Sequence, residues 1–255
     1  MNSKNLIAVA ALVFAMAATI LAQRGGQRGA GAQQPPQTPR AAAPIDLTGY
    51  WVAIVTEDWR FRMVTPPKGD FASIPVTPAG TQVGQQWDPA KDEAAGEQCK
   101  SYGAPAIMRV PGRIHITWDN DTTLKVETDA GQQTRLFHFG EFQPPAGPAT
   151  WQGNSLANWE VAGRGRGGPA AGGSLKVVTT GVRPGYLRKN GYPYSDKATV
   201  AEYYDRTNES NGDTWIVITT IVNDPVYLSQ EFITSTHFKK QADAAGWNPQ
   251  PCTAR

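Results

Sequence analysis

The sequence predicts an all-β domain built from short antiparallel strands, and three observations lead to this prediction. Apolar and polar side chains alternate in several short runs of the chain. The 20 Pro and 26 Gly residues separate these runs with turn signals. No window longer than about ten residues follows the 3.6-residue period of a helix. Alternation is typical of strands with one buried face, and turn residues between such runs favour hairpins.

The clearest expected strand is 113–118 (RIHITW), in which apolar and polar residues alternate strictly. Residues 123–128 (TLKVET) repeat this pattern after a turn. In chain order, the other expected strands are 49–55, 60–64, 133–139, 157–161, 174–180, 198–206, 213–222 and 233–240. Residues 88–99 predict one short helix, with Asp88 as its N-cap and Pro89 at its first position.

About ten such strands in some 200 residues predict an antiparallel β-barrel of about 8–10 strands, with a two-sheet β-sandwich as the alternative. Several strands mix aromatic, apolar and polar side chains, which suits a lumen that holds a ligand. We therefore expect a lipocalin-like barrel.

The chain divides into three expected regions. Residues 1–22 combine a positive start, an apolar run and a small residue at the end, which predicts a cleaved secretory signal peptide. Residues 23–44 are rich in Gly, Gln, Pro and Arg, and we expect a disordered linker. Residues 45–255 form a single β-barrel domain in this interpretation. We expect the mature protein to be periplasmic or secreted.

The distribution of charge weakens a nucleic-acid interpretation. Of the 24 Lys and Arg residues, four precede residue 41, whereas all 22 acidic residues follow it. The remainder of the chain therefore carries 20 basic and 22 acidic residues, a net charge of −2, and lacks the basic excess of a nucleic-acid-binding domain. After the signal no further apolar segment is long enough to span a membrane, so we expect no stable membrane embedding.

Two features of the chain bear on cofactors and cross-links. The glycine-rich stretch 164–173 lacks the strand-then-helix context of a dinucleotide-binding loop, and we interpret it as a linker between strands. We predict no cofactor.

Cys99 and Cys252 are the two cysteines of the chain, and in an oxidising compartment we expect them to form a disulfide. Two unrelated thiols are the alternative.

Several motifs occur together in a characteristic order: DLTGYW (46–51), PVTPAG (75–80), WDPAKDEAAGEQCKSYGAP (87–105), PATWQGNSLANWE (148–160), GYPYSD (191–196), YYDR (203–206) and NDPVYL (223–228). Through them the chain resembles a large, uncharacterised family of secreted bacterial β-barrel proteins. The resemblance covers about residues 45–240. It departs at Tyr203 or Tyr204, where the family carries Arg, and in a longer insertion after Glu160. It implies a secreted barrel and no particular activity.

Ser155 lies in a stretch, GNSLA, that is close to a nucleophile elbow. That motif needs a strand before the serine and a helix after it. A strand follows here instead, so we interpret Gly153 and Asn154 as a tight turn whose backbone bonds the Ser155 hydroxyl.

Glu160 and His138 are the candidate catalytic residues. A carboxylate beside Trp159 in an apolar lumen would have a raised pKa and suit acid-base chemistry, with His138 as its partner. A salt bridge from Glu160 to Arg135 or Arg206 is the alternative. The three histidines, His115, His138 and His237, lack ligand spacing, and we predict no metal site.

The leading functional hypothesis is a barrel that binds a small, partly apolar organic molecule in its lumen. The expected ligand-binding residues are Trp118, Arg135, Trp151, Trp159, Tyr203 and Arg206. The first alternative is an extracytoplasmic isomerase, lyase or hydrolase that uses Glu160. The second is an envelope protein that recognises another protein through exposed strand edges.

Overall fold

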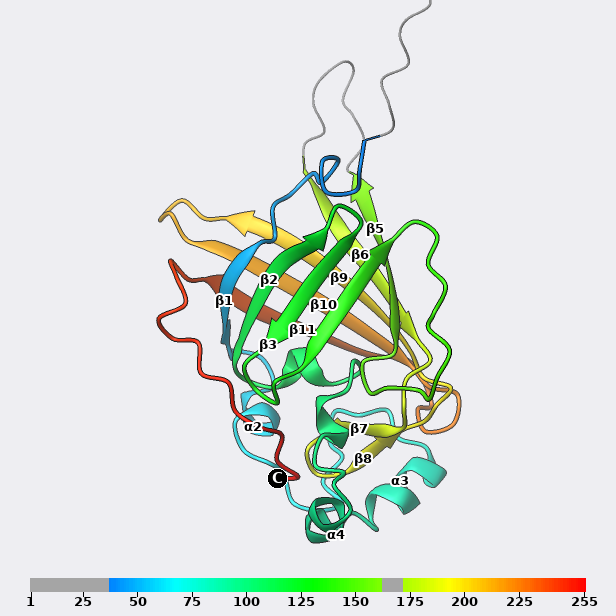
Figure 1. Ribbon diagram of the computed structural model, residues 1–255. Coiled ribbons are helices and arrows are strands. Elements are labelled where there is room, and N and C mark those ends of the chain that lie inside the picture. Colours follow the sequence, from blue (N-terminus) through cyan, green and yellow to red (C-terminus); the bar gives the residue numbers. More distant parts are fainter. Residues whose placement is uncertain (1–36, 162–171) are drawn as a thin grey trace, which may run out of the picture. The chain divides into compact units, whose positions relative to one another are not determined.

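Nine strands close into a barrel in the computed structural model, which describes residues 37–161 and 172–255 (Figure 1). Around the barrel the strand order is β1-β11-β10-β9-β6-β5-β4-β3-β2. Their bounds are β1 (Gly49–Ile54), β2 (Arg113–Asn120), β3 (Thr123–Thr128), β4 (Thr134–Phe139), β5 (Asn154–Val161), β6 (Gly173–Thr180), β9 (Thr199–Asn208), β10 (Thr214–Asn223) and β11 (Phe232–Lys240). Because β1 pairs with both β2 and β11, the ring is closed. The predicted all-β barrel is confirmed, and the β-sandwich alternative is wrong.

One pair of strands departs from the predicted antiparallel arrangement. β4 and β5 run parallel, with Phe137 opposite Ser155 and Phe139 opposite Ala157. The reason is the long connection 140–153, which leaves the far end of β4 and returns to its starting end before β5 begins. A parallel neighbour requires such a crossover, whereas a short hairpin turn would have reversed the direction.

The expected strand at 60–64 is wrong, because this segment contains helix α2 (Trp59–Arg62). Its backbone is set by Asp58, which has a left-handed conformation (φ 49°), and by the bond from Met63 N–H to Trp59 O. Five alternating residues do not distinguish a strand from one helical turn.

The predicted helix is confirmed as α4 (Pro89–Ala94), where Asp88 accepts a hydrogen bond from Ala90 N–H at 3.1 Å.

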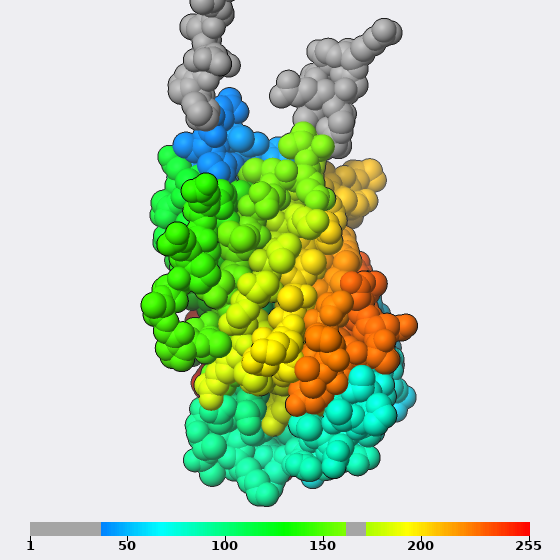
Figure 2. Space-filling model, turned by 90° about the vertical axis from the view of Figure 1, so that its right-hand side faces the viewer, coloured from blue at the N-terminus to red at the C-terminus, as the bar shows by residue number. Residues whose placement is uncertain are grey.

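Five further elements lie outside the barrel sheet and were not predicted. They are α3 (Pro78–Gly84), the 3-10 helices η1 (Lys100–Tyr102) and η2 (Ile107–Arg109), and a two-stranded sheet of β7 (Gly185–Arg188) and β8 (Tyr192–Tyr194). Together with α2 and α4 they lie at one end of the barrel (Figure 1). We call this end, which residues 55–112 cover, the base. In Figure 2 the cyan segment covers the strands there.

The opposite end of the barrel, which we call the rim, is covered by residues 38–48. Trp159 donates its indole N–H to Pro39 O at 2.8 Å, and Trp51 donates to Leu47 O at 3.0 Å. The expected signal peptide and most of the expected linker, residues 1–36, lie outside the described residues, as does most of the glycine-rich stretch 164–173. Residues 38–44, by contrast, form turns that contact the barrel.

Side chains fill the lumen of the barrel. The inward-facing residues are almost wholly buried and form one cluster, which includes Trp51, Ile116, Leu124, Val126, Phe137, Leu175, Val177, Tyr204, Ile216, Ile218 and Phe238. The layer nearest the base is polar, with Arg135, Ser155, Thr179 and Glu202. The lumen is therefore a packed core, as in small barrels whose interior is just wide enough for side chains.

Candidate functional site

Arg135 is the one predicted ligand-binding residue that lies deep in the lumen. Its Nη1 and Nη2 donate to Glu202 Oε1 and Oε2 at 2.8 and 2.6 Å, and Nη2 also donates to Thr179 Oγ1 at 3.2 Å. Burial by itself lowers the pKa of Arg135, but Glu202 and Tyr204 outweigh it and raise that pKa. The ion pair is thus satisfied within the core and presents no free charge to a ligand.

The predicted tryptophans do not line one chamber. Trp118 and Trp159 meet at the rim, where each ring centroid lies 5.5 Å from that of Phe139. Trp151 follows the 140–150 connection near the base, and the Arg183 guanidinium lies 4.5 Å from its ring centroid.

Tyr203 and Arg206 are likewise separated. Tyr203 faces outward beside Lys176, since its neighbour Tyr204 faces the lumen. Arg206 lies near the rim and donates to Asn208 Oδ1 at 3.2 Å. The six predicted ligand-binding residues therefore lie in four separate places. Arg135 is in the lumen, Trp151 is near the base and Tyr203 is on the outer face. The other three, Trp118, Trp159 and Arg206, are at the rim.

Glu160 and His138 both face away from the lumen. The Glu160 side chain is 49% exposed, and its Oε1 lies 3.5 Å from Lys176 Nζ. His138 stacks on Phe142 with a centroid distance of 3.8 Å. Since His138 pairs with Leu156, four residues before Glu160, the two side chains are about 13 Å apart along the sheet. We predicted acid-base chemistry for Glu160 and His138 because we expected both side chains to lie in an apolar lumen. Neither side chain lies there.

Ser155 faces the lumen and is buried. Its Oγ lies 2.8 Å from Thr179 Oγ1, so the hydroxyl bonds a side chain of β6 and not the turn backbone that we expected. The turn itself is present, because Gly153 has a positive φ of 58° and its N–H donates to Thr150 O. A Cβ at position 153 would lie 2.5 Å from Thr180 O, which explains the glycine.

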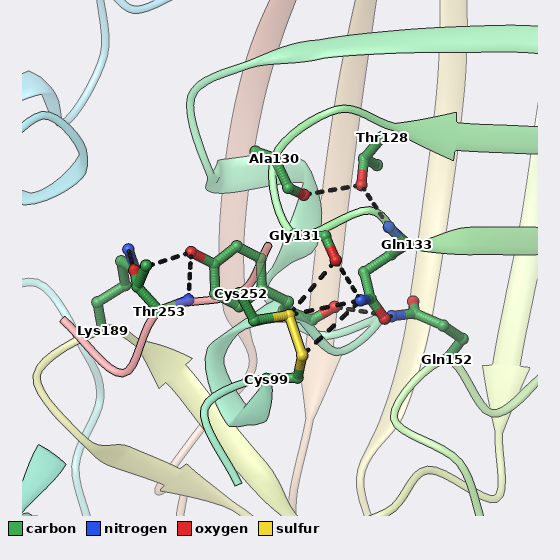
Figure 3. The surroundings of a disulfide bond; sticks show 10 residues. Cys99, Thr128, Ala130, Gly131, Gln133, Gln152, Lys189, Cys252 and Thr253 are labelled. Atoms are coloured by element: carbon green, nitrogen blue, oxygen red, sulfur yellow. Dashed lines mark hydrogen bonds between the residues drawn. A yellow bond between two sulfur atoms is a disulfide. The ribbon is translucent and has the colours of Figure 1, made fainter. Parts of the chain in front are cut away.

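The predicted disulfide joins Cys99 to Cys252, and no free cysteine is present (Figure 3). It fixes the C-terminal tail, residues 241–255, to the base. Gln133 supports this junction, since its Nε2 donates to Gly131 O at 2.6 Å. The tail also pairs with the barrel through Gln250, which donates to Asp129 O and accepts from Gly131 N–H.

A site that the sequence did not predict lies at the base. Arg62 from α2, Arg109 from η2 and Arg188 from β7 line one small cavity of about 30 Å³, and we call these three residues the arginine cradle. This free volume holds one or two water molecules. The other residues of its wall are Phe61, Thr65, Ser101, Ala106, Val110, Pro111, Leu187 and Lys189.

Each of the three guanidinium groups contacts a carboxylate or a backbone carbonyl. Arg62 Nη1 contacts Glu57, and Arg109 Nη2 lies 3.0 Å from Asp58 Oδ2. Arg188 Nη2 donates to Ala72 O at 2.8 Å. Within the part of the chain that the structure describes, Arg62 Nη2, Arg188 Nε and both Nη atoms of Arg109 are buried and have no hydrogen-bond partner, although Arg109 Nη2 lies within ion-pair distance of Asp58.

Burial of these unpaired groups is costly. The Arg62 and Arg109 side chains are 1% and 7% exposed, and Arg188 is also buried. A buried donor without an acceptor costs about 1–3 kcal/mol, and more when it is charged. An anion in the cavity would offset part of the repulsion among these buried positive charges.

The pKa values of the cradle indicate unbalanced positive charge. Burial and the charge of Arg109 lower the pKa of Arg62 to about 10. Burial and the same neighbour lower the pKa of Arg188 to about 10, although Asp58 and Asp70 oppose this. Burial also lowers the pKa of Arg109, and Asp58 offsets only part of the effect. The cradle is therefore short of negative charge.

The arginines of the cradle come from positions 62, 109 and 188, so no local motif connects them. The only signal in the sequence is Arg109 within the apolar run 104–111 (APAIMRVP), where a charge is unexpected.

Comparisons with family models, with curated proteins and with solved structures gave no match. The fold and site therefore define only a class, a closed nine-stranded β-barrel with an arginine-lined cavity at its base.

Among residues 37–161 and 172–255, no three His, Cys, Asp or Glu side chains are grouped as they would be to hold a metal ion. Within the same ranges, every helix is too short or too polar to cross a bilayer.

Proposed function

We propose that this protein binds a small organic acid outside the cytoplasm and holds its anionic head in the arginine cradle. The observation that carries the proposal is that three buried arginine side chains line one cavity. A carboxylate or phosphate accepts hydrogen bonds from arginine in the planar geometry that the guanidinium group offers.

The balance of charge supports an anionic ligand. Among residues 37–161 and 172–255, Glu57 and Asp58 are the acids that form ion pairs with the three arginines of the cradle, and Asp70 acts on Arg188 from a greater distance. Lys189 also lines the cavity and adds a fourth cation. In a site shielded from water, an anion would be attracted more strongly than at an exposed surface.

The cradle is a better candidate than the lumen for small-molecule binding. Trp51, Phe137 and Tyr204 occupy the lumen with essentially no exposed surface, whereas the cradle encloses free volume. A location outside the cytoplasm is supported by the Cys99–Cys252 bridge, because such bonds persist in oxidising compartments. The resemblance to secreted barrel proteins agrees with this location.

The proposal is tested by NMR titration of the ¹⁵N-labelled protein with acetate and inorganic phosphate at constant ionic strength. We expect saturable shifts of amides in α2, η2 and β7. Arg109→Gln should weaken binding by roughly tenfold to a hundredfold, the equivalent of one lost charge-assisted bond. Asp58, the partner of Arg109, is partly exposed, so its loss of a partner should not prevent folding.

Arg206→Gln is the matched control. Arg206 is a partly buried arginine with an unpaired Nε, but it lies at the rim. This variant should bind the anions as the wild type does. Equal loss of binding in both variants, or no saturable shift in the wild type, would contradict the proposal.

A further inference from the structure

A second cavity lies on the outer face of the barrel, beside the connection between β9 and β10. Figure 1 shows this connection at the end of the barrel away from the base. The cavity has a volume of about 490 Å³, which is within the usual range of small-molecule sites. Trp215 and Val217 from β10 and His237 from β11 form its floor, and the turn 209–213 forms its wall. The residues that line it differ from those of the arginine cradle.

The side chains of the floor point away from the lumen. Ile216 and Phe238 are buried in the lumen cluster, so strand alternation turns their neighbours Trp215, Val217 and His237 outward. Val217 lies directly opposite His237 in the pairing of β10 with β11. All three outward side chains are half-buried. The floor therefore presents the ring of a tryptophan next to the ring nitrogens of a histidine.

The His237 ring is held in one orientation by Glu57. His237 Nδ1 lies 2.9 Å from Glu57 Oε2. An ionised carboxylate can only accept a hydrogen bond, so Nδ1 carries the proton and the neutral ring has its free acceptor at Nε2. Because Glu57 occupies Nδ1, Nε2 is the ring nitrogen that remains for a ligand.

The wall is a well-bonded turn that carries polar groups. Asp213 N–H donates to Asn211 Oδ1 at 2.9 Å, and Glu209 N–H donates to Asp213 O at 2.8 Å. Lys239 Nζ lies 2.8 Å from Asp213 Oδ2 and 5.9 Å from the centroid of the Trp215 ring. This ammonium group balances the charge of Asp213 beside the tryptophan. The cavity thus combines an aromatic floor with both donors and acceptors at its edge.

We infer that this cavity binds a neutral sugar, with a pyranose ring lying on Trp215. A pyranose has an apolar C–H face, which packs against an aromatic ring, and hydroxyl groups around its edge that both donate and accept hydrogen bonds. His237 Nε2 would accept from one hydroxyl, and the polar side chains of the turn 209–213 would bind others. The site is separate from the arginine cradle, and the inference goes beyond the proposed function.

An organic cation is the competing ligand, because ammonium groups also bind to aromatic rings beside acids. Lys239 already supplies a positive charge next to both Trp215 and Asp213. A second cation there would be repelled. This distribution of charge favours the neutral sugar.

The test is NMR titration of the ¹⁵N-labelled protein, separately with glucose, galactose, mannose and N-acetylglucosamine. We expect at least one of these sugars to shift the Trp215 indole N–H saturably. Trp215→Ala should weaken that binding by about tenfold or more, whereas Trp215→Phe keeps an aromatic floor and should bind within about threefold of the wild type. His237→Phe removes one acceptor and should weaken binding by about two- to tenfold. Trp215 lies outside the lumen core, so its replacement should leave the barrel folded.

Trp247→Ala is the matched control. Trp247 is also half-buried, and its ring centroid lies 5.7 Å from that of Tyr50, which faces outward from β1. β1 is two strands from β10 in the barrel. This variant should bind the sugars as the wild type does.

Three results would overturn the inference. The first is the absence of a saturable shift with all of these sugars. The second is an equal loss of binding in Trp215→Ala and Trp247→Ala. The third is tighter binding of tetramethylammonium than of every sugar, which would assign the cavity to an organic cation. None of these results bears on the arginine cradle, whose titration with acetate and phosphate is followed at the amides of α2, η2 and β7.

Discussion

Arg62 donates its Nε–H to the backbone carbonyl of Arg109 at 2.9 Å. This bond joins α2 to η2 and holds two buried guanidinium groups against one cavity. Burial lowers the pKa of both residues, and the charge of Arg109 lowers the pKa of Arg62 further. Such an arrangement costs stability in the free protein, and a bound anion would repay part of that cost.

The first prediction follows from this linkage. Replacing chloride by phosphate at constant ionic strength should raise the melting temperature of the wild type, because a ligand of the folded state stabilises it. At about 100 times its Kd, the anion should add about 2.7 kcal/mol to the free energy of unfolding. Differential scanning calorimetry measures the change. In Arg109→Gln the increase should largely vanish, and an undiminished increase there would show that the anion acts elsewhere.

The second prediction concerns the ion pair inside the barrel. Glu202→Gln should lower the free energy of unfolding by about 3–5 kcal/mol, because it leaves Arg135 as an uncompensated buried charge. Urea denaturation measures this loss. Glu160→Gln is the matched control, since Glu160 is a half-exposed acid on β5, two strands from β9. Its replacement should change the free energy of unfolding by less than about 0.5 kcal/mol. A small effect at Glu202 would contradict the structural role.

The third prediction concerns the disulfide. Replacing both Cys99 and Cys252 by Ser removes a cross-link between residues 153 positions apart. In the chain-entropy model the loss is about 4–5 kcal/mol. Urea denaturation of the variant, compared with the oxidised wild type, gives the value. The tail should also detach from the base, so the amides of Gln250 and Gly131, which bond across this junction, should lose protection from hydrogen exchange. Unchanged protection of these two amides would mean that the disulfide does not hold the tail in place.

The fourth prediction is a pH dependence at His138. Burial lowers the pKa of His138 below 6.5, although Asp119 partly opposes this. The unfolded chain therefore takes up this proton before the folded protein does, and stability should fall as the pH drops through 6.5 towards the lower folded-state value. Melting curves between about pH 7.5 and about pH 5 measure the fall. His138→Gln should reduce it, and an identical pH profile would remove His138 as a contributor.

Most of the barrel could be predicted from the sequence because its strands carry local information. The alternation of Ile114 and Ile116 with polar neighbours in β2 is visible within six residues. The helical turn at Trp59–Arg62 is too short for its period to be recognised. The parallel pairing of β4 with β5 depends on the path of residues 140–153, which no local pattern encodes.

The candidate site could not be predicted because it depends on long-range geometry. Glu160 and Trp159 are adjacent in sequence, yet strand alternation turns Glu160 outward while Trp159 packs at the rim. Arg135 lies in the lumen, but its partner there is Glu202, which is 67 residues away in the sequence. The cradle needs three chain segments to meet beneath the barrel, and their meeting depends on the packing of the base.

The central claim is that the arginine cradle binds an oxyanion, and anomalous diffraction from crystals grown with selenate tests it most directly. Selenate is a tetrahedral oxyanion whose selenium atom can be located independently of the protein atoms. We predict an anomalous peak in the cavity, with oxygens within hydrogen-bond distance of the guanidinium groups of Arg62, Arg109 and Arg188. A cavity that holds only water, with selenate bound solely at other surfaces, would contradict the account.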